Sequence, residues 1–140
     1  MSKEFLNPPD LPNWEQVFSQ VVVVPNGAWK TVYLSGQVSV DKDKNLVGGD
    51  DLGAQARQAL QNLDTALRSV GATAADVVKL NIYVKNYKPA DAAPVGEALR
   101  HYFPRGKMPA STWLGVQSLA EEGFLIEVDA IAMLDAGASR

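Results

Sequence analysis

The sequence of 140 residues contains no cysteine and only one histidine, His101. Without cysteine the chain can form no disulfide, no thiolate nucleophile and no zinc site built on sulfur. A Ser-His-Asp triad or a metal site would have to use this single imidazole, which follows Arg100 on a predicted helix, where surface histidines are common. The pair Gly48-Gly49 lacks the spacing of a phosphate-binding loop. We therefore expect neither a metal nor another cofactor.

Long hydrophobic runs and an excess of positive charge are also missing. The longest run of Val, Ile and Leu covers only residues 21–24, whereas about 20 apolar residues are needed to cross a bilayer. Residues 1–5 show no apolar segment of the kind found in signal peptides. The 13 Lys and Arg are outnumbered by 16 Asp and Glu, so the basic footprint of nucleic-acid binding is absent. We expect a soluble, cytoplasmic protein that binds neither membranes nor nucleic acids.

The composition that remains is that of a single globular domain over residues 1–140. Apolar residues make up 46% of the chain and charged residues 21%, and a chain of this length can bury a substantial core. Prolines at positions 8, 9 and 12 predict that residues 1–16 form an extended N-terminal arm, with Trp14 as its anchor.

Turn residues and apolar periodicity divide the rest of the chain into strands and helices. The clearest element is a helix whose apolar residues recur at helical spacing from Leu52 to Val70, followed by Gly71 as a stop signal. We expect strands over residues 18–24, 29–35, 37–40, 77–85, 111–116 and 125–133, and helices over residues 52–70 and 90–102.

The last predicted strand indicates how the layers are arranged. Its alternate residues 126, 128, 130 and 132 are small and apolar, whereas Glu127 and Asp129 point to the opposite face. This pattern predicts an α+β fold in which two helices cover one face of a mixed sheet. The other face must be either solvated or covered by a partner, and the pattern alone leaves both possibilities open.

Six short stretches occur in the order typical of one known family. Residues 18–20, 35–37, 59–72, 76–85, 108–112 and 126–132 together resemble the RidA/YjgF family of imine and enamine deaminases. The resemblance covers residues 18–133 and implies a chorismate-mutase-like subunit that forms a homotrimer. It also implies that small-molecule ligands bind in clefts between subunits.

The same resemblance implies which residues line the cleft. Glu127 matches the carboxylate that positions or activates water, and Ser35 and Gly36 match the turn that presents a hydroxyl and backbone groups. Lys79 matches a lysine on the middle strand. Glu127 is thus a candidate acid/base residue, because burial raises a carboxyl pKa toward neutrality; alternatively, it is a hydrogen-bonded interface carboxylate.

Four further positions of the implied cleft distinguish this chain. The arginine that holds the substrate carboxylate in deaminating members is Ser111 here, followed by Thr112. Phe18 replaces a tyrosine and Trp113 replaces a cysteine, which makes the cleft more aromatic, unless Trp113 points into the core. Serine lacks both the charge and the two-pronged geometry of arginine, so we expect inefficient turnover of small imino acids.

Two cations lie just upstream of Ser111. Arg105 and Lys107 either supply a replacement charge or belong to a solvated loop.

Three functions remain open from the sequence. The first is a RidA-like hydrolase or deaminase that acts on an enamine or imine of a neutral or larger substrate, with Glu127 as the acid/base residue. The second is a trimeric ligand-binding or interaction protein without catalysis. The third, RNA cleavage, is least expected, because the chain is acidic and lacks paired histidines.

Overall fold

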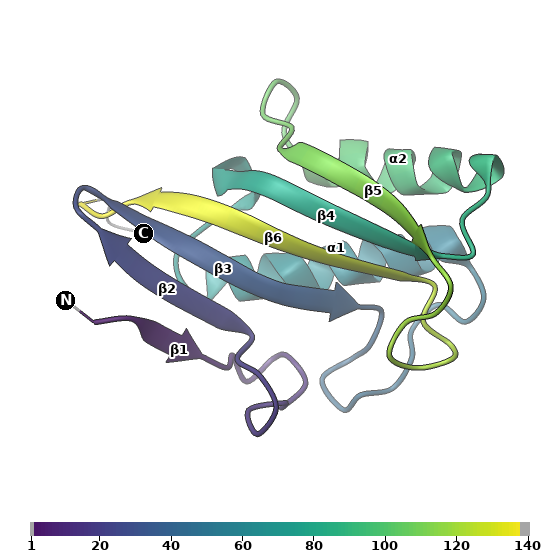
Figure 1. The fold of residues 1–140 in the computed structure, drawn as a ribbon, viewed down its shortest axis with the longest axis horizontal. Helices are drawn as coiled ribbons and strands as arrows, with labels where there is room; N and C mark the ends of the chain where they lie inside the picture. Colours follow the sequence, from purple (N-terminus) through teal and green to yellow (C-terminus); the bar gives the residue numbers. More distant parts are fainter. Residues whose placement is uncertain (1, 138–140) are drawn as a thin grey trace.

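The computed structural model describes residues 2–137 as a six-stranded sheet with two α-helices packed on one of its faces (Figure 1). The strand order is β1-β2-β3-β6-β4-β5, and only β4 and β5 are parallel neighbours. The predicted α+β architecture is thereby confirmed. The elements are β1 Glu4–Leu6, β2 Val21–Asn26, β3 Trp29–Val38, α1 Leu52–Arg68, η1 Ala74–Asp76, β4 Val77–Lys85, η2 Pro89–Asp91, α2 Ala92–Tyr102, β5 Ala110–Val116 and β6 Ile126–Asp135.

The N-terminal segment contains more structure than the expected extended arm. Its strand β1 pairs with β2 at the edge of the sheet, with Phe5 opposite Val22, and Leu11 is a buried core residue. Strand β2 begins three residues later than predicted because the backbone turns at Trp14, whose carbonyl accepts the N–H groups of residues 17 and 18. Phe18 therefore precedes the sheet instead of pairing within it. Residue 1 and residues 138–140 lie outside the described part of the chain.

Strand β3 joins two segments that the sequence predicted as separate strands. Its pairing with β6 shifts between Leu34, which faces Ala130, and Gln37, which faces Val128. Two residues of β3 therefore stand opposite one residue of β6, which is the arrangement of a β-bulge. The bulge consists of residues 35 and 36, so it places the Ser-Gly pair beside β6.

The helices follow the predicted pattern, with shifted ends. Asp51 caps α1 by accepting the N–H of Ala54 at 3.1 Å, and α1 ends two residues before the predicted Val70. Helix α2 begins two residues late because residues 89–91 form a 3₁₀ turn that starts at a proline. Pro94 falls in the first turn of α2, where no helical hydrogen bond is lost.

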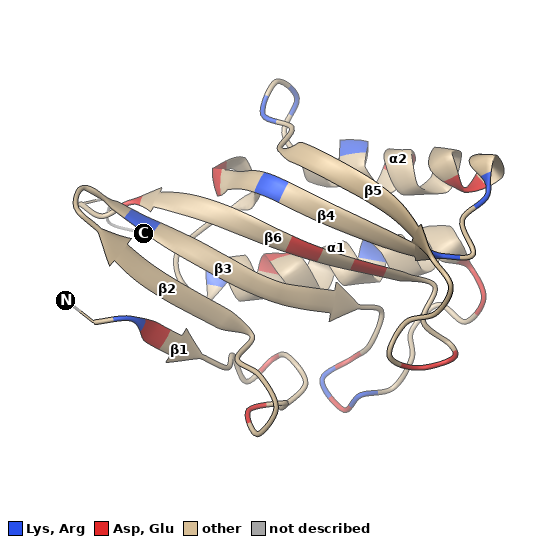
Figure 2. Cartoon of the chain, viewed as in Figure 1, with Lys and Arg blue, Asp and Glu red and all other residues tan. Residues whose placement is uncertain are grey.

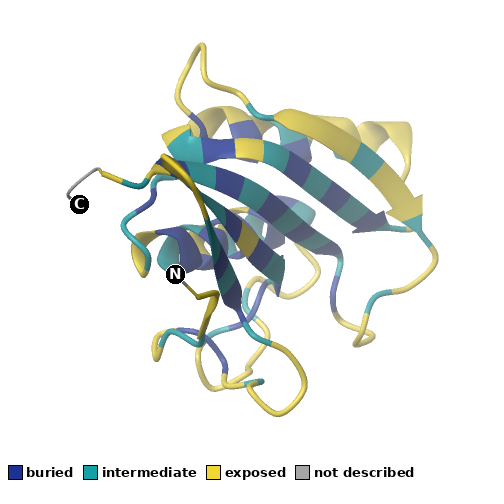
Figure 3. Ribbon diagram, turned by 60° about the vertical axis from the view of Figure 1, so that its left-hand side comes forward, coloured by how far each residue is buried: buried dark blue, intermediate teal, exposed yellow. Residues whose placement is uncertain are grey.

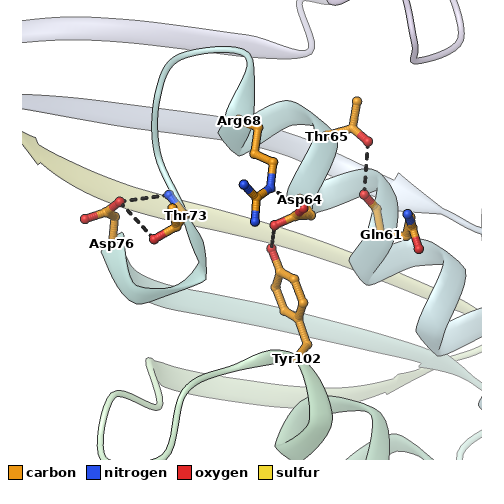
Figure 4. A network of polar contacts seen from close by, with 7 residues as sticks. All are labelled: Gln61, Asp64, Thr65, Arg68, Thr73, Asp76 and Tyr102. Carbon is orange, nitrogen blue, oxygen red and sulfur yellow. Dashed lines mark hydrogen bonds and ion pairs between the residues drawn. The ribbon is translucent and has the colours of Figure 1, made fainter. Parts of the chain in front are cut away.

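A polar cluster links the two helices (Figure 4). The Asp64 carboxylate accepts hydrogen bonds from Arg68 Nε at 2.7 Å and from the Tyr102 hydroxyl at 2.8 Å. Burial, followed by the hydrogen bond to Asp64, raises the pKa of Tyr102. The tyrosine therefore stays a neutral donor that ties α2 to α1.

Burial alternates along the central strands (Figure 3), so the two faces of the sheet differ. The side that faces the helices is closed, and Val32, Ile82 and Ala132 have no exposed surface. We call the opposite side the open face. By register it carries several large apolar side chains that remain substantially exposed: Phe5 at 62%, Leu114 at 50%, Trp29 at 49% and Tyr33 at 47%.

In the part of the chain that the structure describes, no helix combines the length and the apolar character needed to cross a lipid bilayer.

Candidate functional site

A pocket of about 410 Å³ lies where the N-terminal loop meets the bulge of β3 and the start of β6. Four of the residues predicted for the site line it, namely Phe18, Ser35, Gly36 and Glu127. The walls are mostly apolar. The lining consists of Pro12, Trp14, Val17, Phe18, Gln20, Ser35, Gly36, Gln37, Val38, Val40, Lys44, Ala120, Glu121, Phe124 and Glu127.

The bulge allows Glu127 to lie directly against the backbone of β3. A Cβ atom added to Gly36 would overlap Oε2 of Glu127 and would lie 2.8 Å from its Cδ. Any other residue at position 36 would therefore displace the carboxylate. Glycine is needed at position 36 for close approach to the carboxylate, and not for an unusual backbone angle.

Glu127 is half-buried, and no group in residues 2–137 donates a hydrogen bond to its carboxylate. Burial raises the pKa of Glu127, and the nearby Asp129 carboxylate raises it further. A carboxyl group with a raised pKa and free oxygens is suited to accepting and returning a proton near neutral pH.

Asp129 lies two residues further along β6 on the same face of the sheet, in a different environment. Its Oδ1 accepts a hydrogen bond from Asn81 Nδ2 at 2.8 Å. Tyr83 lies close by, and desolvation together with Asp129 raises the pKa of its hydroxyl. Asp129 thus belongs to a polar group on the open face, and it does not line the pocket.

The Ser35 hydroxyl holds the N-terminal loop in place. It donates a hydrogen bond to the Ser19 carbonyl at 2.6 Å, while Gln37 Nε2 donates to Gln20 Oε1 at 2.8 Å and Gln20 Nε2 donates to the Pro12 carbonyl at 3.1 Å. Sequence reasoning overlooked both glutamines. Both glutamines lie in stretches that carry the family resemblance, residues 18–20 and 35–37, and this was the signal that could have found them.

Two aromatic rings and a lysine form the rim of the pocket. Trp14 stacks on Phe18, with ring centroids 6.3 Å apart and planes 22° from parallel. Lys44 Nζ lies 3.9 Å from the centroid of the Trp14 ring, within the range of a cation–π contact. Sequence reasoning treated Trp14 as an anchor and did not single out Lys44.

The residues of β5 lie elsewhere in the single chain. Ser111 stands opposite Leu80 and Trp113 stands opposite Ile82, and both partners are buried on the helix-facing side. Trp113 packs against that core. The expectation that Ser111 and Trp113 share a face is confirmed, but one chain does not bring them to the pocket of Glu127.

Lys79 and Thr112 form a pair on the open face. Lys79 Nζ donates a hydrogen bond to Thr112 Oγ1 at 2.8 Å, and neither residue lines the pocket. Arg105 and Lys107 are exposed in the loop before β5 and also lie outside it. Of the residues predicted for the site, a single chain thus assembles only the group around Glu127.

Comparison with known proteins identifies the relatives of this chain. The family model described as Endoribonuclease L-PSP matches residues 10–134. A 2-iminobutanoate/2-iminopropanoate deaminase from Dermatophagoides farinae is 29% identical over 133 residues, which cover 95% of this chain and 98% of that protein. The protein of the same name from Rattus norvegicus is 32% identical over 116 residues, covering 83% of this chain and 79% of the relative.

Solved structures agree with the sequence comparison. The Rid family protein YyfB of Yersinia pestis, whose function is unknown, has a TM-score of 0.73 at 38% identity, covering 96% of this chain and all of that one. Since the family model spans nearly the whole sequence and the matched structures are Rid proteins, the chain belongs to the RidA/YjgF family, described by its model as Endoribonuclease L-PSP.

Proposed function

We propose that this protein is a RidA-like hydrolase that deaminates an enamine or imine of a neutral or larger substrate, with Glu127 as the acid/base residue. The observation that carries the proposal is the placement of the Glu127 carboxylate, which has no donor of its own and lies against Gly36 in a largely apolar pocket. Relatives named as imine deaminases align over most of the chain, which supports this reaction class.

The reaction needs only water and a carboxyl group that exchanges protons. Water adds to the carbon of the C=N bond while ionised Glu127 accepts one of its protons. The protonated carboxyl returns this proton to nitrogen, which gives a carbinolamine. The carboxylate then accepts the hydroxyl proton and passes it to the same nitrogen, so the C–N bond breaks and ammonia leaves as the C=O bond of the ketone forms. The carboxylate is regenerated, so no cofactor takes part.

The functional unit in this proposal is a homotrimer. The open face presents Phe5, Tyr33 and Leu114 with 62%, 47% and 50% of their surface exposed, and covering such a face stabilises an assembly through apolar burial. Strand β5 ends the sheet with an unpaired edge. Ser111 and Thr112 of one copy would then complete the cleft around Glu127 of another, whereas Trp113 packs against the core of its own chain.

The lining of the pocket favours a substrate larger than the smallest imino acids. Trp14 and Phe18 form an aromatic rim, and aromatic walls favour planar or apolar groups. Lys and Arg are scattered over loops, helices and strands instead of forming one patch (Figure 2), which argues against nucleic acid as a substrate. The proposed function involves no membrane.

A second candidate function is non-catalytic ligand binding by the same trimer. The observation in its favour is that the Ser35 hydroxyl already donates to the Ser19 carbonyl, which occupies the one proton that it could donate to a substrate. In this case the pocket would bind the ketone and the imine alike and would hydrolyse neither.

The test combines assembly and turnover in one preparation. Light scattering at micromolar concentration should give the mass of three chains. Imines of increasing size, generated in solution, should then lose ammonia faster with the wild type than with buffer, and the acceleration should increase from 2-iminopropionate to aryl-bearing imines. A monomer would contradict the trimer, and binding without acceleration of any imine would favour the second candidate function.

A further inference from the structure

Lys44 is the only cationic side chain among the described residues that line the pocket. Two carboxylates, Glu121 and Glu127, line the same pocket. The other cations considered from the sequence lie outside it: Lys79 is bonded to Thr112, and the loop before β5 is exposed. The charge balance within the pocket of one chain therefore depends on Lys44.

A tightly bonded turn fixes the position of Lys44. The Asp41 carboxylate accepts the N–H groups of Asp43 and Asn45, each at 2.9 Å, and the Asn45 side chain at 3.3 Å. Lys44 itself has a φ of 70°, a left-handed conformation that few residues other than glycine adopt. Because the turn is closed at both ends, the lysine side chain starts from a defined place at the rim.

The ammonium group of Lys44 is free to meet a ligand. It lies 3.9 Å from the centroid of the Trp14 ring, and no carboxylate in residues 2–137 lies within ion-pair distance of it, since the ion pair found there joins Arg68 and Asp64. A cation over an aromatic face keeps its hydrogen-bond donors available. An anionic ligand beside Glu127 would need such a counter-charge, because the carboxylate alone would repel it.

We propose that Lys44 binds the carboxylate of a larger 2-imino acid whose planar or aromatic side chain lies along Trp14 and Phe18. The lysine thus determines specificity, in place of an arginine at position 111. This inference rests on the proposed function only for the imino group of the ligand. Binding of the carboxylate by Lys44 does not depend on turnover. The neutral substrates allowed by the proposed function become the less favoured class.

The test measures binding with ligands that do not react. Phenylpyruvate, the ketone product of an aryl-bearing imino acid, and its neutral amide are titrated by calorimetry into the wild-type protein and three variants. Lys44→Gln removes the charge, Lys44→Arg keeps it, and Lys42→Gln is the matched control, because Lys42 is exposed in the same turn and does not line the pocket. Thermal melts establish that each variant is folded.

The wild type and the Lys42→Gln variant should bind phenylpyruvate equally. Lys44→Gln should weaken binding of the acid by about fivefold to tenfold, Lys44→Arg by less than about threefold, and the affinity for the amide should not change in any variant; these ranges correspond to one charge-assisted hydrogen bond in a partly exposed site. Loss of affinity for acid and amide alike, unchanged binding of the acid by Lys44→Gln, or no binding of the acid by the wild type would each overturn the proposal.

Turnover separates this inference from the proposed function. If binding of the acid depends on Lys44 while no imine is hydrolysed, the deaminase assignment fails and the carboxylate site stands. If imines are hydrolysed and Lys44→Gln changes neither the affinity for the acid nor the KM of an anionic imine, the assignment stands and the role of Lys44 is refuted.

Discussion

Glu127 and Asp129 share a strand and a face, with one residue between them, yet their surroundings differ. Asp129 receives a hydrogen bond from Asn81 and sits within a polar group of the open face. Glu127 has no such donor among residues 2–137 and lies against the bare backbone of Gly36 at the bulge of β3. A satisfied carboxylate holds its neighbours in place, whereas a half-buried carboxylate without a partner is available for chemistry. The difference arises from the neighbouring strands, because β6 presents both residues in the same way.

The strongest test of this contrast replaces each carboxylate by its amide. Glu127→Gln should lower the rate of imine hydrolysis by about 100-fold or more, because the amide keeps the shape but accepts no proton. Asp129→Asn should lower it by less than about tenfold, provided that the Asn81 contact is kept. Initial rates compare the activity of the two variants with that of the wild type, and circular dichroism shows that both variants are folded. Equal losses would show that the two carboxylates act as one group.

The second test moves Glu127 without changing it. Gly36→Ala places a methyl group on the carboxylate, so the reacting oxygen must shift, and we expect a loss of activity of about 10- to 100-fold. Gly53→Ala is the matched control. A Cβ atom at position 53 would lie 3.4 Å from its nearest neighbouring atoms, which is an ordinary contact, and alanine favours the helical conformation. Rates and melting temperatures should separate the two variants. An active Gly36→Ala enzyme would mean that the close approach has no role.

The third test places a cation at position 111, which the proposed trimer would bring to the cleft of a neighbouring copy. Wild type should accelerate hydrolysis of 2-iminopropionate little over background, and Ser111→Arg should gain at least about tenfold, which corresponds to about 1.4 kcal/mol of transition-state binding. Ser118→Arg, an exposed position beyond β5, adds the same charge elsewhere and should gain nothing. A wild type that is already fast, or a folded trimeric Ser111→Arg variant without gain, would refute the argument.

The smallest expected effect is on stability as a function of pH. Because the pKa of Glu127 is raised in the folded state, the folded chain binds this proton more tightly than the unfolded chain. Stability attributable to Glu127 is therefore lost as pH rises from its ordinary pKa, 4.5, through the raised value, and it stays lost above that value. The melting temperature of Glu127→Gln relative to wild type should thus increase from pH 4 to pH 7. A difference independent of pH would contradict the shift.

Much of the fold could be predicted because it follows from local periodicity. The apolar residues of α1 recur at helical spacing, and apolar and polar residues alternate along β6. Each pattern alone shows which side of its element is buried. For that reason the sequence correctly predicted that Glu127 and the helices occupy opposite sides. The bulge at Ser35 and Gly36 could not be predicted in the same way, since it exists only in the pairing of β3 with β6.

The site was only partly predictable for a related reason. Resemblance to the family predicted four pocket residues, namely Phe18, Ser35, Gly36 and Glu127. Lys44 was not predicted, because it lines the pocket only through the contact of its turn with the loop that bears Trp14. No spacing in the sequence indicates that two loops meet. The position of Ser111 beside Leu80 also required the register of β5 with β4.

The bulge of β3 changes which residues of the strand, even-numbered or odd-numbered, point into the core. Before it, even-numbered residues such as Val32 and Leu34 point into the core, and after it the odd-numbered Gln37 and Ser39 do so. Deleting one of the two bulge residues would leave Leu34 and Gln37 two positions apart, as in a regular strand, so the later side chains would keep their faces. The core would survive this deletion, but the extra residue that brings the backbone of position 36 against the Glu127 carboxylate would be lost. Among relatives of this chain, the length between Leu34 and Gln37 should therefore vary less than the identity of the residues that fill it.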